Sequence, residues 1–73
     1  MAHNEQRQRV QRGTRAPEVL RVRVARLVDE LGARGAAQRL KLSRQATIAI
    51  VADQPVLPGT IALAERSLGI EAA

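Results

Sequence analysis

A chain of 73 residues without cysteine, phenylalanine, tyrosine or tryptophan can build only one small domain with a thin aliphatic core, and it can form neither disulfides nor thiolate metal sites. Its apolar runs fall well short of the ~20 residues of a membrane helix, so we expect a cytoplasmic protein without a membrane partner. Because so small a core barely offsets chain entropy, we also expect a homodimer.

The net charge of +5 is distributed unevenly along the chain. Residues 1–26 hold seven arginines against two acidic residues, residues 27–52 hold four basic residues against two acidic ones, and residues 53–73 hold one against three. This asymmetry suits a polyanionic partner, because Lys and Arg side chains displace its condensed counterions. A solvated, arginine-rich surface is the alternative.

Residues 1–15 (MAHNEQRQRVQRGTR) are polar and offer almost nothing to bury. We therefore predict a flexible basic arm in front of a domain that spans residues 16–73. The arm could contact DNA phosphates or the minor groove, or it could be a frayed terminus. Its arginines are Arg7, Arg9, Arg12 and Arg15.

An amphipathic first helix is predicted from Pro17 to Leu31. Pro17 suits a first helical turn, Glu18 complements the positive helix end, and Gly32 is a stop signal. Val19 and Val22 lie off its apolar stripe, so they are either exposed or in contact with a partner chain. The stripe consists of Leu20, Val24, Leu27, Val28 and Leu31.

Residues 20–24 (LRVRV) also alternate as a β-strand does, which leaves a ribbon-helix-helix repressor open as a structural alternative. In that fold Arg21 and Arg23 would point from a two-stranded ribbon into the major groove. Gly32 and Gly35 argue against it, because they would interrupt the long helix that such a fold needs.

Residues 33–52 (ARGAAQRLKLSRQATIAIVA) carry the strongest pattern in the chain. They predict a short Ala-rich helix, a break at residues 41–42, and a second helix that opens at Ser43. The Ser43 hydroxyl can accept a hydrogen bond from a backbone N–H that the first helical turn leaves unpaired. Two helices with so short a break cross steeply, which presents the second one to a partner.

This stretch resembles the helix-turn-helix of lambda-repressor-like, Cro-type DNA-binding domains. In a twenty-residue motif that begins at Ala33, Ala37 supplies the small residue that lets the two helices approach in that family, and five of six inward positions are apolar. The resemblance implies an all-α fold: a small four-helix helix-turn-helix domain. The six positions are occupied by Ala36, Ala37, Leu40, Leu42, Thr47 and Ile50.

The resemblance extends to residues 54–60 as a loop and to residues 61–68 as the next helix, in which Ile61, Ala64 and Leu68 can close the core. The motif also departs from the family at three positions. Lys41 replaces a glycine whose turn needs a positive φ, so we expect a strain of about 1 kcal/mol or a different turn. Thr47 replaces a branched apolar residue, and Ala33 replaces a glutamine.

The resemblance implies direct reading of base pairs in the major groove by the second helix. Arg44 would donate two hydrogen bonds to guanine, Gln45 would pair with adenine, and Ile48 would contact a thymine methyl. Ile50 and Val51 are expected on the core side; the alternative for Ile48 is a core or dimer contact. Phosphate contacts are expected from Arg34, Lys41, Ser43 and the N–H groups of Gly59 and Thr60.

No pattern predicts catalysis, a metal site or a cofactor: the sequence has no Gly-rich phosphate loop and no cluster of ligands or nucleophile–base pairs. The first functional hypothesis is a nucleoid-associated transcriptional regulator, a dimeric repressor that binds double-stranded DNA at a palindrome. The second is a protein-binding adaptor or antitoxin-like module that docks an acidic partner protein.

Overall fold

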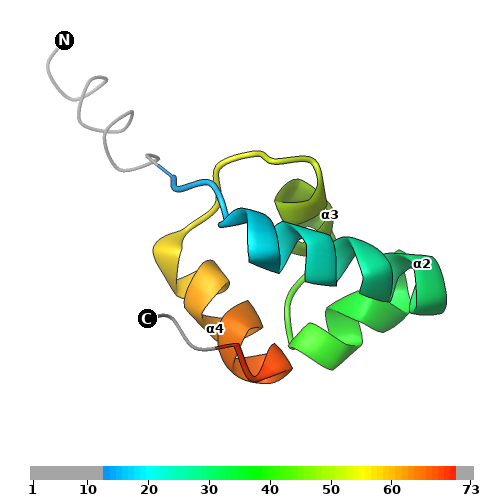
Figure 1. The fold of residues 1–73 in the computed structure, drawn as a ribbon. Coiled ribbons are helices and arrows are strands. Elements are labelled where there is room, and N and C mark those ends of the chain that lie inside the picture. The colour runs from blue at the N-terminus through cyan, green and yellow to red at the C-terminus, as the bar shows by residue number, and fades with distance from the viewer. Residues whose placement is uncertain (1–12, 71–73) are drawn as a thin grey trace, which may run out of the picture.

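The computed structural model describes residues 13–70. In that range the chain forms three helices and no strand: α2 (Glu18–Leu40), α3 (Arg44–Val51) and α4 (Pro58–Leu68) (Figure 1). The helix α2 packs against both α3 and α4. None of these helices is long and apolar enough to cross a membrane. The predicted all-helical fold is thus confirmed for the described residues.

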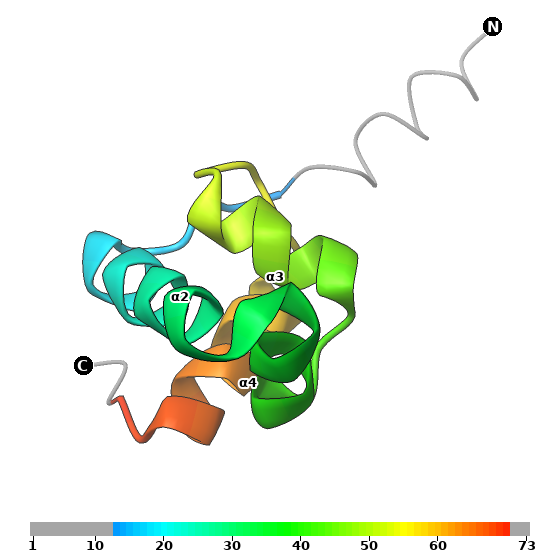
Figure 2. The same ribbon diagram turned by 90° about the vertical axis from the view of Figure 1, so that its right-hand side faces the viewer.

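The helix α2 bends at Gly32, where the sequence predicted a stop. Gly32 has φ 79° and ψ 166°, a backbone region that is essentially restricted to glycine. The N-terminal part of α2 (residues 18–31) and its C-terminal part (residues 33–40) therefore run in different directions (Figure 2). A Cβ on Gly35 would lie 2.8 Å from the Cβ of Leu31, so this glycine permits the close approach of the two parts.

Residues 20–24 lie within the N-terminal part of α2, so the strand interpretation of this segment is wrong. Leu20 and Val24 are one helical turn apart and both are buried, whereas Val22 between them is exposed. The helical spacing of the apolar stripe extends over several turns, and it outweighs the short alternation of residues 20–24.

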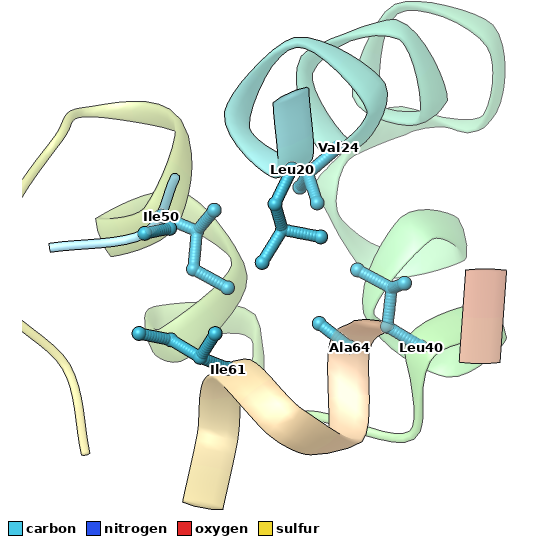
Figure 3. Packing of buried hydrophobic residues seen from close by; sticks show 7 residues of the cluster. Leu20, Val24, Leu40, Ile50, Ile61 and Ala64 are labelled. Atoms are coloured by element: carbon cyan, nitrogen blue, oxygen red, sulfur yellow. The ribbon is translucent and has the colours of Figure 1, made fainter. Parts of the chain in front are cut away.

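Side chains from all three helices meet in one aliphatic core (Figure 3). Leu31 was predicted to belong to it, but its side chain is 49% exposed because the chain turns away at Gly32 directly after it. Partly buried residues around the core include Leu27, Leu42 and Leu68. The buried cluster consists of Ala16, Leu20, Val24, Leu40, Ile50, Ile61 and Ala64.

The segment before α2 is fixed to the segment before α4. The N–H of Thr14 donates to the carbonyl of Val56 at 2.8 Å, and the N–H of Val56 donates back to Thr14 at 3.0 Å. Ala16, which the sequence did not single out, is buried in the core. Packing contacts therefore begin near Gly13, within the stretch predicted as an arm.

The helix α4 starts at Pro58, three residues before the predicted start at Ile61. The prediction of a loop through Thr60 is therefore wrong. Pro58 lies at the first helical position, where its missing N–H costs nothing and its fixed φ suits the helix. The prediction failed because it took the proline and glycine as loop residues rather than as a helix start.

All three helices end in the same type of cap, in which one residue adopts a left-handed conformation: Lys41 (φ 61°), Asp53 (φ 61°) and Gly69 (φ 73°). In each cap this residue and its successor donate their N–H groups to carbonyls in the last helical turn. Only the third cap uses glycine, which adopts positive φ without steric cost.

Candidate nucleic-acid interface

The turn between α2 and α3 comprises residues 41–43. The Lys41 N–H donates to the Gln38 carbonyl at 3.2 Å, and the Leu42 N–H donates to the Ala37 carbonyl at 3.0 Å. The sequence left two outcomes open at Lys41, a strained positive φ or a different turn, and the structure has the positive φ. Leu42 then packs against the core, which fixes the exit direction of the chain.

Ser43 caps α3 as predicted. Its backbone is extended (φ −71°, ψ 160°), and its Oγ accepts a hydrogen bond from the N–H of Ala46 at 3.0 Å. The oxygen is occupied as an acceptor, while the hydroxyl proton is still available to donate. The first turn of α3 has no acidic residue, so nothing there offsets the positive end of the helix dipole.

The six inward positions of the sequence motif are all turned toward the interior. Five of the six side chains are buried, and Leu42 is partly buried. Thr47 is completely buried, but its hydroxyl is satisfied because Oγ1 donates to the Ser43 carbonyl at 2.9 Å. Thr47 therefore fills an inward position without leaving an unpaired polar atom.

The opposite face of α3 is exposed and carries the three residues predicted to read bases. Arg44 and Ile48 lie one turn apart on the same side of the helix, and Gln45 lies beside Arg44. Ile48 is 50% exposed, so the alternative of a core position for it is wrong. Val51 was predicted on the core side, but it is exposed, because it ends α3 and the core cluster closes on Ile50 instead.

Four of the residues predicted to contact phosphate have exposed side chains or backbone: Arg34, Lys41, Ser43 and Gly59. Lys41 and Ser43 come together with Arg44 at the N-terminal end of α3, whereas Arg34 comes from α2 and Gly59 from the first turn of α4. The N–H of Thr60 already donates to the Leu57 carbonyl at 2.9 Å. A phosphate contact through that N–H would therefore compete with an internal hydrogen bond.

An ion pair that the sequence did not reveal ties the end of α3 to the start of α2. Arg21 Nε lies 3.4 Å from Asp53 Oδ1 and 3.4 Å from the carbonyl oxygen of Ala16. Both charged groups are partly exposed, so the pair contributes little to stability. Its geometric effect is to hold Asp53, in the cap that follows α3, against the N-terminal part of α2.

A second contact that the sequence did not reveal is a hydrogen bond from α4 to the last residue before the turn. Ser67 Oγ donates to the Leu40 carbonyl at 3.2 Å, across 27 residues of sequence. Leu40 is the last residue of α2, so its carbonyl has no partner within the helix. The hydroxyl of Ser67 supplies that partner and links α4 to the start of the turn.

Of the predicted arm, Arg15 is exposed, while Arg7, Arg9 and Arg12 lie outside the described residues. No group of three potential ligand side chains in residues 13–70 could hold a metal ion. Comparison with protein-family models, curated proteins and solved structures finds no match to this chain.

Proposed function

We propose that this protein is a sequence-specific regulator that binds double-stranded DNA through α3. One observation carries the proposal: α3 buries Thr47 and Ile50 while it exposes Arg44, Gln45 and Ile48 directly after a three-residue turn. In this proposal α3 and residues 33–40, the C-terminal part of α2, form a helix-turn-helix. Two further helices support it in a four-helix domain: α4 and residues 18–31, the N-terminal part of α2.

In this mechanism the N-terminal half of α3 enters the major groove, where all four base pairs differ in their hydrogen-bonding groups. Arg44 donates to guanine O6 and N7, and Gln45 pairs with adenine N6 and N7. Ile48 contacts a thymine methyl, which gives a half-exposed isoleucine an apolar partner.

Phosphate contacts are proposed on either side of the exposed face of α3. Lys41 and Ser43 lie at the start of α3, so they suit the DNA strand along the edge of the groove. Arg34 and the first turn of α4 at Gly59 would add contacts on either side. These contacts set the position of the domain on DNA and carry no sequence information.

A homodimer on a palindrome is part of the proposal, with half-sites about one helical turn apart. Among residues 13–70, seven large apolar side chains are exposed, which supports burial of some of them in a second copy. They are Val19, Val22, Leu31, Ile48, Val51, Leu57 and Leu63.

Gel shifts over a salt series test the proposal, with a duplex recovered by selection and a random duplex of equal length. Arg44→Ala is expected to lower affinity for the selected duplex about tenfold or more and to leave random binding nearly unchanged, because a good bidentate base contact discriminates by about 1–3 kcal/mol. Arg66→Ala removes the same charge from an exposed position on α4 and serves as the matched control.

Lys41→Ala is expected to weaken both duplexes alike and to reduce the salt slope by about one, as a phosphate contact does. Equal loss on both duplexes for Arg44→Ala would refute its base-reading role. If the unmodified protein produces no shift at ~50 mM salt, the DNA-binding proposal fails and the adaptor alternative takes its place.

A further inference from the structure

A groove, here called the arginine groove, lies between α2 and the last turn of α4. Its volume is about 240 Å³, and no residue of α3 lines it. Arg21 and Arg23 lie about 200° apart around α2. Arg21 reaches Asp53 after α3, whereas Arg23 borders the groove with Leu68 of α4, so the groove lies away from α3. The lining residues are Arg23, Arg26, Leu27, Glu30, Arg39 and Leu68.

The arginine groove carries an excess of positive charge. Three arginines face it and only one carboxylate, that of Glu30. Among residues 13–70 the one ion pair is that of Arg21 with Asp53, so Glu30 forms no ion pair with any of the three arginines. Arg26 precedes Glu30 by four residues, which is the less favourable order for a helical ion pair. An anion in the groove would relieve this repulsion and receive charge-assisted hydrogen bonds from guanidinium groups.

The groove also has an apolar part, here called its floor. Leu27 and Leu68 line it, are partly buried and pack against the core, so they add a fixed aliphatic surface to the charged lining. A phosphate backbone makes no use of such a surface, whereas an aliphatic side chain does. The volume is also below the ~300–1,000 Å³ of typical small-molecule sites, which favours the side chains of a docked segment over an enclosed ligand.

We propose that the arginine groove docks an acidic segment of a partner protein. Carboxylates of that segment pair with the three arginines, and a branched aliphatic side chain between the carboxylates packs on Leu27 and Leu68. The groove shares no residue with the exposed face of α3. Docking here does not depend on the proposed DNA binding.

The test is a titration of the ¹⁵N-labelled full chain, followed by NMR, with a synthetic peptide in which two Glu residues flank each Leu on either side, so that an extended peptide places Glu and Leu on the same face. Amide shifts are expected at residues that line the groove and not at the exposed face of α3. The double variant Arg23→Gln/Arg26→Gln is expected to weaken binding about tenfold, because each exposed ion pair accounts for a few-fold. The matched variant Arg15→Gln/Arg66→Gln removes the same charge elsewhere and is expected to change binding less than twofold.

Three results would overturn the proposal. Equal weakening in the two double variants would mean that net charge alone attracts the peptide. Equal binding of a peptide with Ala in place of Leu would remove the role of the apolar floor. Absent peptide shifts, together with weaker binding of a random duplex by Arg23→Gln/Arg26→Gln, would assign the groove to the DNA backbone instead. The same spectra report whether each variant is folded.

Discussion

The chain changes direction at both ends of residues 33–40, and the two bends are built differently. At Gly32 the backbone (φ 79°, ψ 166°) is one that only glycine adopts readily, and a Cβ there would meet no atom within 4 Å. At Lys41 a side-chain-bearing residue takes φ 61° and ψ 38°, a left-handed conformation that costs ~1–2 kcal/mol. The first bend therefore depends on residue type, whereas the second is held by its surroundings.

The contacts that hold the second bend come from both sides of the turn. Leu42 packs against the core, and Ser67 of α4 donates to the carbonyl of Leu40. The end of α4 is an internal reference, because Gly69 forms the same hydrogen-bonded cap with the favoured residue. The comparison indicates that the left-handed conformation at Lys41 is held by packing contacts rather than favoured by its residue type.

The largest expected effect is that of Gly32→Ala, which should destabilise the protein by about 2 kcal/mol because alanine is strained at this φ and ψ. Urea denaturation measures the change. Gly59→Ala is the matched control: its added Cβ has open space and α4 gains a better helix former, so no loss of stability is expected. If the two variants behave alike, the first bend does not require glycine.

Ser67→Ala should have a smaller effect, a loss of about 1 kcal/mol, because the Leu40 carbonyl loses its hydroxyl donor. Thr47→Val is the control, because it also removes a hydroxyl group that donates a hydrogen bond to a backbone carbonyl. There the Ser43 carbonyl keeps the N–H of Thr47 at 3.1 Å, so denaturation should show little change. A neutral Ser67→Ala would mean that α4 does not brace the turn.

The smallest expected effect on stability is that of Lys41→Gly, a gain of about 0.5 kcal/mol. Glycine removes the strain of the left-handed conformation, but it also raises the conformational entropy of the unfolded chain. The first contribution to the free energy of unfolding exceeds the second by only this much. Lys41→Ala removes the same charge without relieving the strain, so it should not be stabilised. Under the DNA-binding proposal both variants lose affinity equally in gel shifts. A destabilised Lys41→Gly would show that the turn is unstrained.

Features that depend on residues close together in the sequence could be predicted. Ser43 as a cap and an interruption at Gly32 follow from residue type, while the inward positions around Ala37 came from the family resemblance of residues 33–52. Leu31 was misjudged because spacing alone does not show where the packing partners of a helix end. Pro58 and Gly59 were a local signal for the start of α4, but the same residue types are also typical of a loop.

Contacts between distant residues could not be predicted. The pairing of Thr14 with Val56 and the bond from Ser67 to Leu40 join positions whose sequences carry no sign of each other. The arginine groove likewise requires both parts of α2 and the end of α4, so it exists only once the chain is folded. The residues proposed to read bases are exposed, which agrees with the sequence hypothesis, while their contact with DNA remains a prediction.

Selection of bound duplexes from a random pool tests the central claim most directly, with the unmodified protein and Arg44→Ala run in parallel. The unmodified protein is expected to enrich a palindromic motif with a guanine in each half-site, and Arg44→Ala is expected to lose preference at that guanine while it still retains duplexes at low salt. No enriched motif, or the same motif for both proteins, would contradict the assignment of α3 as the reading helix.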